Sequence, residues 1–232
     1  LVPGLAGLPQ RVVEDLILDG RIVVIGAVTT AWDQAHDVIA TMGDRFVLVR
    51  MDSSVGRDAA RRNAIRNTGS ENIMRAELSA AVAGVLGGVN DAADLSLTEE
   101  ETERIGRAAD LVTLARTAVI FDYRGDVVDA HAPEMPTRFA KQLAQIIRGG
   151  VALGMDREKA LGLAVRCARD SMPPLRLAIV DDVAATPHST PSDIRRRLDK
   201  PRATVDRQCQ ALHMLGVLVV DEEPYGEYGK VR

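Results

Sequence analysis

Residues 20–52, GRIVVIGAVTTAWDQAHDVIATMGDRFVLVRMD, are the stretch around which the rest of the sequence is organised. Within it, residues 22–28 form an apolar run interrupted only by the small residues Gly26 and Ala27. A run that is this short and this rich in β-branched residues predicts a strand that is buried on both faces of a parallel sheet. Thr29 and Thr30 follow at its carboxyl end, the edge at which open α/β sheets bind ligands.

An arginine follows this strand tip at a short distance in the sequence. Arg45 stands in the turn Met42-Gly43-Asp44-Arg45-Phe46, just before a second apolar run at residues 47–49 that we expect to form an edge strand. A polar strand tip followed closely by an arginine is suited to handling phosphate. The alternative is that the threonines only satisfy backbone groups and the arginine is solvated.

The composition limits the classes of function. With 232 residues, of which 46% are hydrophobic and 27% charged, the chain is long enough for one large domain or several small ones. Its net charge of -4 offers no global field for nucleic acid, so any such contact requires a local patch. Aromatic residues make up 3%, which predicts an aliphatic core.

The cysteines and the apolar runs bear on location. Cys167 and Cys209 lie far apart and form no CxxC motif, which predicts a reducing cytoplasm and cysteines used as small apolar residues. No apolar run approaches the roughly 20 residues that span a bilayer. The chain begins with Leu and ends shortly after a turn, so we expect it to be a fragment.

The middle of the chain reads as helical. We expect helices in residues 57–89 with a break at residues 68–70, and another that starts at Ser96 or Thr98 and reaches Val119. A turn follows at residues 124–126. Further helices are predicted from Thr137, which acts as cap, to about Arg148, and over residues 156–170.

Arg138 falls in the first turn of the helix capped by Thr137. The helix dipole slightly disfavours a positive charge at that end, so an anion explains Arg138 better than helix stability does. Glu134, between Pro133 and Pro136, is either an acid leading into the helix or a partner for a nearby arginine.

The last part of the chain predicts a winged helix-turn-helix. A helix at residues 175–183 is followed by the capping box Thr190-Pro191-Ser192-Asp193, by a third helix through Val205, Cys209, Leu212 and Leu215, and by a strand at residues 217–220. A hairpin turn follows, and Val231 begins the return strand.

The third helix of this domain presents polar residues away from its apolar side. The predicted DNA contacts are Lys200, Arg202, Thr204, Arg207 and Gln208, with Arg195, Arg196 and Arg197 nearby. Against this, Asp221, Glu222, Glu223 and Glu227 in the wing would repel phosphate. The alternative is a winged domain that binds protein or is only structural.

Other sites that sequence can reveal are weakly supported. The phosphate-binding pattern GxxxxGK[ST] does not occur, and the acidic strand-like segments at residues 179–182 and 218–222 are better explained inside the winged helix. His36 and the pair Cys209 and His213 fall short of the ligands that a metal site needs, so none is expected.

Taken together, the order of these pieces resembles the C-terminal half of AAA+ ATPases, closest to minichromosome-maintenance helicases and AAA+ proteins of phages and mobile elements. The resemblance implies an α/β remnant of a parallel-sheet P-loop core at residues 1–56, a helical lid at residues 57–172, and a winged helix-turn-helix at residues 173–232 that is truncated in the wing. Such a chain would be mostly α.

The resemblance also implies roles for single residues. Thr29, with Thr30 second, matches sensor 1, which positions the attacking water; Arg45 matches the arginine finger that acts on the neighbouring subunit; and Arg138 matches sensor 2 at the γ-phosphate. Thr29, Thr30 and Arg138 would be the nucleotide-binding residues. Walker A and Walker B motifs are missing from this chain, so by itself we expect it to be inactive and to bind no cofactor.

The resemblance implies that the full-length protein uses ATP and Mg²⁺, assembles into an AAA+ ring or oligomer, and acts as a helicase-like ATPase on DNA in the cytoplasm, with no membrane contact. The alternative is a winged-helix transcription regulator without ATPase activity, in which the α/β part only oligomerises or binds a ligand.

Overall fold

A computed structural model describes residues 23–34, 46–52, 55–90, 93–221, 224–225 and 230–231. The chain separates into two units, Leu1–Gln34 and Ala35–Arg232. The described residues are mostly helical, which confirms the predicted predominance of α structure.

In the first unit, the described residues 23–34 contain the short helix α2 (Ala31–Gln34) and no strand. Val23 is 82% exposed and Ile25 is 94% exposed. The prediction of a strand buried on both faces is therefore wrong for residues 23–28. A buried strand requires hydrogen-bonded neighbours, and the described part of this unit offers no strand to pair with.

The second apolar run, residues 47–49, also forms no strand. It is held at the end of helix α8 (Arg157–Asp170), where the backbone N–H of Leu48 donates to Oγ of Ser171 at 3.0 Å. The backbone N–H of Arg50 donates to Oδ2 of Asp170 at 2.9 Å, and its Nε donates to the Asp170 carbonyl at 2.7 Å. The expected edge strand is thus wrong, because polar groups at a helix end take the place of a neighbouring strand.

Helices α4 (Arg57–Arg66) and α5 (Glu71–Gly87) follow, and Gly69 between them has a φ of +89°. The predicted pair of helices and the break at residues 68–70 are confirmed. Their apolar stripes are not buried within the described residues, since Ile73 and Leu78 are each 65% exposed. The hydrophobic periodicity therefore predicts where these helices lie, but not which residues they pack against.

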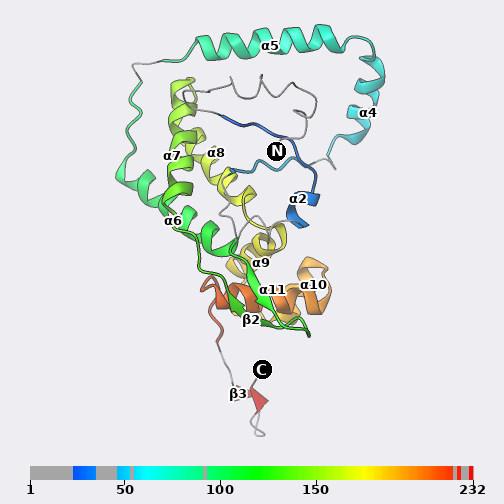
Figure 1. The fold of residues 1–232 in the computed structure, drawn as a ribbon, viewed down its shortest axis with the longest axis vertical. Coiled ribbons are helices and arrows are strands. Elements are labelled where there is room, and N and C mark those ends of the chain that lie inside the picture. Colours follow the sequence, from blue (N-terminus) through cyan, green and yellow to red (C-terminus); the bar gives the residue numbers. More distant parts are fainter. Residues whose placement is uncertain are drawn as a thin grey trace, which may run out of the picture. The chain divides into compact units, whose positions relative to one another are not determined.

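The main core of the larger unit lies among α6 (Glu99–Ala115), α7 (Thr137–Ala152) and α8, which run side by side (Figure 1). Phe139 and Leu143 of α7 are fully buried in one cluster with Val112 of α6 and Ala164 of α8. Most of this core is aliphatic, as the scarcity of aromatic residues predicts. Burial of such side chains contributes about 1.5–3 kcal/mol each.

A capping box starts α6. Oγ1 of Thr98 accepts from the Glu101 N–H at 3.2 Å, and Oε2 of Glu101 accepts from the Thr98 N–H at 2.8 Å. Of the two predicted caps, Ser96 and Thr98, the structure selects Thr98. The helix ends at Ala115 rather than at Val119, so the predicted C-terminal end is too late.

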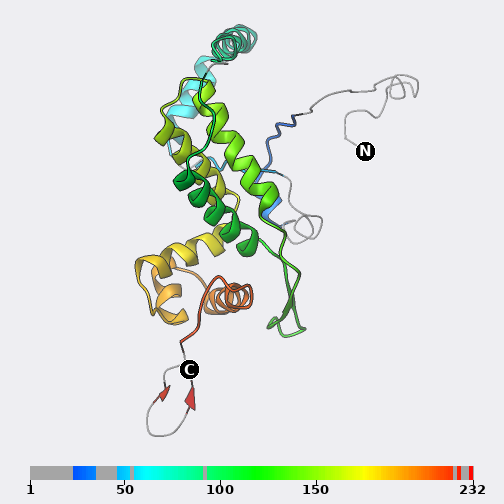
Figure 2. The ribbon, with the colours of Figure 1, turned by 90° about the vertical axis from the view of Figure 1, so that its left-hand side faces the viewer.

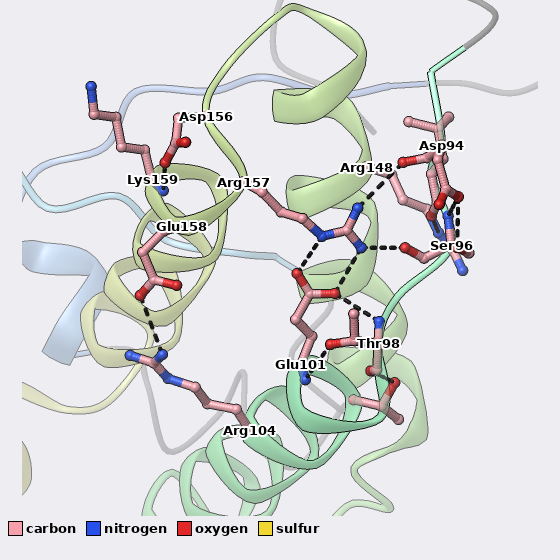
Figure 3. Close-up of polar contacts among 12 residues, drawn as sticks. Asp94, Ser96, Thr98, Glu101, Arg104, Arg148, Asp156, Arg157, Glu158 and Lys159 are labelled. Atoms are coloured by element: carbon pink, nitrogen blue, oxygen red, sulfur yellow. Dashed lines mark hydrogen bonds and ion pairs between the residues drawn. The ribbon is translucent and has the colours of Figure 1, made fainter.

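Arg157, the first residue of α8, fastens the segment before α6 to the bundle (Figure 3). Its Nε binds Oε1 of Glu101 at 2.6 Å and its Nη2 binds Oε2 at 2.8 Å. The same guanidinium donates to the carbonyls of Asp94 and Ser96. Because the hydrogen bonds from Arg157 stabilise the Glu101 carboxylate, the pKa of Glu101 falls to about 2. Glu101 is thus a structural anchor between α6 and α8.

An antiparallel hairpin connects α6 to α7: β1 (Val119–Phe121) pairs with β2 (Val127–Ala130). The predicted turn at residues 124–126 is confirmed, and Gly125 takes a φ of +84° there. The sequence pattern does not predict these two strands, because it places Val119 at the end of the preceding helix. Their β-branched residues favour a strand only once the turn brings the two segments together.

The last part of the chain contains α9 (Pro174–Ala185), α10 (Pro191–Leu198) and α11 (Arg202–Met214), followed by β3 (Pro224–Tyr225) paired antiparallel with β4 (Lys230–Val231) (Figures 1 and 2). The three predicted helices are confirmed. The strand predicted at residues 217–220 is wrong, because Val217 and Leu218 donate their N–H groups to the Leu212 carbonyl at 2.9 and 3.2 Å and close the end of α11 instead.

Candidate nucleic-acid interface

Helices α9, α10 and α11 pack around a shared apolar centre. Ile179 of α9, Ile194 of α10, and Val205 and Leu212 of α11 are all buried in the same cluster. These contacts fix which side of α11 faces inward. The residues on the opposite side of α11 are therefore held at the surface in a defined orientation.

A tight turn joins α10 to α11. Asp199 adopts a left-handed conformation, with φ 50° and ψ 53°, and the Lys200 N–H returns to the Arg195 carbonyl at 3.1 Å. Pro201 then serves as the N-cap of α11 without a side-chain cap, and no acidic residue stands in the first turn. The first amides of α11 therefore keep their partial positive charge, which favours an anion at this end.

The exposed surface at the start of α11 includes Lys200, Arg202 and Thr204, three of the predicted DNA contacts. Nε of Arg202 lies 3.2 Å from Oδ2 of Asp206, one helical turn further on. Both the arginine and Thr204 remain open to solvent. We refer to Lys200, Arg202 and Thr204 as the α11 face.

The other two predicted contacts are engaged within the protein. Nη2 of Arg207 donates to the Arg124 carbonyl in the hairpin at 3.0 Å. Gln208 is half-buried, and its Oε1 accepts from Nε of the buried Arg176 at 2.9 Å. Arg207 stays exposed beside the α11 face, whereas the side-chain oxygen of Gln208 is already engaged in the hydrogen bond from Arg176.

The arginines of α10 are also partly committed. Arg197 binds Asp182 of α9 with Nε and Nη2, at 2.7 and 2.6 Å, and its hydrogen bonds lower the pKa of that carboxyl. Arg196 lies 3.2 Å from Asp193, whose pKa is lowered first by a hydrogen bond from the Thr190 hydroxyl. Arg197 thus joins α9 to α10.

The β1–β2 hairpin lies against α11, an arrangement that the sequence did not suggest. Val119 shares an apolar cluster with Ala211 of α11 and with Leu215, which directly follows this helix. The signal that could have revealed the hairpin is the pair of β-branched segments on either side of Gly125, at a spacing suited to a turn. The hairpin therefore borders the candidate interface.

The residues predicted to sense nucleotide in the first unit are Thr29 and Thr30. Oγ1 of Thr29 accepts from the Ala31 N–H at 3.4 Å, and the Thr30 carbonyl accepts from the Asp33 N–H at 3.1 Å. Both threonines are exposed and serve the start of α2, which matches the alternative of backbone satisfaction. Arg45 lies outside the described residues.

Arg138 lies in the first turn of α7, as predicted, and it is half-exposed. Its Nη1 lies 3.1 Å from Oε1 of Glu134, and Nη2 of Arg116 donates to Oε2 of the same carboxylate at 2.9 Å. The Arg116 side chain is 4% exposed and lies over the Phe139 ring at 4.8 Å. Glu134 thus contacts two arginines, which confirms the second of the two roles expected for it, that of a partner for a nearby arginine.

Among the described residues, no group of at least three His, Cys, Asp or Glu side chains is placed to hold a metal ion. Arg138 has a carboxylate partner, and the phosphate-cradling motif is missing from the sequence.

The cysteines behave as packing residues, as predicted. Cys167 is buried in the main core, and burial raises the pKa of its thiol. Cys209 on α11 is half-buried, and burial raises the pKa of its thiol to about 11. Neither thiol is thereby activated as a nucleophile.

None of the helices in the described part of the chain has the length and apolar character needed to span a membrane. Comparisons with protein-family models, with curated proteins and with solved structures found no match to this chain.

Proposed function

We propose that this chain is the C-terminal, DNA-associated part of an AAA+ ATPase, and that helices α10 and α11 bind duplex DNA as a helix-turn-helix. The observation that carries the DNA-binding part is the α11 face: exposed Lys200, Arg202 and Thr204 stand at a helix start that has neither a side-chain cap nor an acidic residue in its first turn. This arrangement supports contact with phosphate.

Each residue of the α11 face has a distinct role in this proposal. Lys200, in the turn, and Arg202 neutralise phosphates and fix the register of the protein on the duplex. Thr204 follows on the exposed side of the helix, where its hydroxyl and methyl group reach a base edge in the major groove. Arg207 remains an additional phosphate contact, although it is also tied to the hairpin.

The AAA+ part of the proposal is supported by the order of the elements. A helical bundle whose second helix carries Arg138 in its first turn is followed by a three-helix unit and a terminal hairpin. We assign Thr29 and Thr30 to sensor 1, Arg45 to the arginine finger and Arg138 to sensor 2. ATP, Mg²⁺ and self-association belong to the full-length protein in this proposal, because the sequence of this chain lacks the phosphate-binding pattern GxxxxGK[ST].

One observation favours the second candidate, a transcription regulator that binds DNA without hydrolysing ATP. The pairing of Arg138 with Glu134 gives this arginine a structural partner, so it needs no phosphate to explain it. The two candidates differ in one measurement. In the full-length protein, Arg45→Ala abolishes DNA-stimulated ATP hydrolysis if the AAA+ assignment is correct, and there is no hydrolysis to abolish in a regulator.

The DNA-binding proposal is tested with this chain directly. Fluorescence anisotropy of a labelled duplex measures the affinity of the wild-type chain and of the variant Lys200→Ala, Arg202→Ala, Thr204→Ala. We expect the variant to lose roughly tenfold or more in affinity, since two phosphate contacts disappear. The matched control, Arg61→Ala with Arg62→Ala on the exposed helix α4, changes the net charge equally and should bind like wild type. Equal affinities for all three proteins would refute the assignment.

A further inference from the structure

We infer that the β1–β2 hairpin is a second DNA-contacting element, in which Tyr123 and Arg124 at the tip hold an unpaired base next to the duplex bound by α11. The inference rests on the proposed function, because it extends the same surface. It adds a preference for DNA with a single-stranded extension, which the α11 face alone does not supply.

Hydrogen bonds close the turn at the hairpin tip. Oδ1 of Asp122 accepts from the N–H groups of Arg124 and Asp126, at 2.8 and 2.9 Å. The Asp122 N–H donates to the Asp126 carbonyl at 2.9 Å, and the Gly125 N–H donates to the Asp122 carbonyl at 3.0 Å. With Gly125 at a φ of +84°, these bonds fix the backbone that carries Tyr123 and Arg124.

The hairpin is fixed to α11 at two places. Near its base, Val119 packs with Ala211 and Leu215. At the tip, Nη2 of Arg207 donates to the Arg124 carbonyl at 3.0 Å, and its guanidinium occupies the space that a Cβ on Gly125 would fill. The tip and the exposed side of α11 are therefore parts of one continuous surface.

The side chains at the tip suit stacking on a base. Tyr123 is 87% exposed, and the Arg124 guanidinium lies over its ring at 5.1 Å from the centroid. An aromatic ring next to an arginine plane is the combination that holds unpaired bases, and stacking of this kind is tolerant of sequence. Because the backbone is already fixed, little conformational freedom is lost when a base binds.

The charges of the hairpin favour a base over the phosphate backbone as the partner of the tip. Asp122, Asp126 and Asp129 outnumber the single arginine, Arg124. Asp126 and Asp129 are exposed, so they repel phosphates. The contact is therefore made mainly by the Tyr123 ring, and its strength should depend little on salt.

The test compares a blunt labelled duplex with the same duplex carrying a single-stranded extension. Wild type should bind the extended DNA more tightly. Tyr123→Ala should lose about fivefold or more of affinity for the extended DNA and keep its affinity for the blunt duplex. Tyr123→Phe should retain the preference, because its ring still stacks. Val128→Ala, an exposed position on β2, is the matched control and should bind like wild type.

A covalent readout complements the affinities. Iodouracil in the single-stranded extension should cross-link on irradiation to the peptide that contains Tyr123. The inference is overturned if wild type shows no preference for the extension, or if Tyr123→Ala binds and cross-links as wild type does. In that case the loss of binding in the α11 face variant would still support the proposed function, whereas failure of wild type to bind the blunt duplex would refute the proposed function itself.

Discussion

Arg176 and Gln208 couple the three-helix unit to the main bundle: Nε of Arg176 on α9 donates to Oε1 of Gln208 on α11 at 2.9 Å. Nη1 of the same guanidinium donates to the carbonyls of Ala115 and Thr117, at the end of α6, at 2.8 and 2.7 Å. Arg176 is 6% exposed, so these bonds are shielded from water. The orientation of α11, and with it the α11 face, is thereby tied to the helical bundle.

Replacement of Arg176 should destabilise the fold. Arg176→Met keeps most of the apolar stem and leaves the carbonyls of Ala115 and Thr117 without these donors, so we expect a loss of about 2–4 kcal/mol in the free energy of unfolding. Chemical denaturation followed by circular dichroism measures this. Arg169→Met is the control, because its ion pair with Asp181 is about half exposed and is worth less than about 1 kcal/mol. Equal losses in the two variants would contradict the coupling.

Glu101 should make stability sensitive to acid. Its pKa in the folded protein is about 2, below the ordinary value of 4.5 for a glutamate, because Arg157 hydrogen-bonds the carboxylate. A lowered pKa contributes stability that is fully present above pH 4.5 and is lost as the pH falls toward 2. We expect Glu101→Gln to lower the free energy of unfolding by on the order of 2–3 kcal/mol at neutral pH. The stability of this variant should also depend less on pH in the acid range.

Stability measured against pH in wild type and Glu101→Gln tests this expectation. Glu158→Gln is the matched control, since Glu158 is exposed and lies 3.5 Å from Arg104. The control should lose stability at acid pH to the same extent as wild type. Parallel pH profiles for wild type and Glu101→Gln would show that the pair with Arg157 does not set the acid stability.

The two arginines that share Glu134 should respond differently to its loss. Arg116 is buried and Arg138 is half-exposed, so Glu134→Ala should cost about 3 kcal/mol through the buried partner. Arg138→Ala should cost less than about 1 kcal/mol. Thermal unfolding of the two variants checks this order. A large loss in Arg138→Ala would mean that its effects on activity report folding rather than nucleotide sensing.

The helices of this chain were predictable because their signals are local. Thr98 with Glu101 and Thr190 with Asp193 carry cap patterns within a few residues, and the structure shows both caps. Gly125 marked a turn for the same reason. Such features depend only on neighbouring residues, so a single sequence contains the information.

The strands and contacts were not predictable in the same way, because they depend on distant partners. Residues 22–28 have the composition of a buried strand, yet the described residues 23–28 are exposed and unpaired with any strand. The strand that starts at Val119 is missed because the apolar spacing up to this residue also fits a helix. The hydrogen bonds that engage Arg207 and Gln208 are made with Arg124 and Arg176, which are far away in the sequence.

The proposed DNA binding depends on whether the α11 face contacts phosphate, and the salt dependence of duplex binding tests this most directly. The logarithm of the association constant should fall linearly with the logarithm of salt concentration for the wild-type chain. For the Lys200→Ala, Arg202→Ala variant, the slope should be smaller by about 2, since each lost phosphate contact removes roughly 0.9. Identical slopes for wild type and variant would contradict the account.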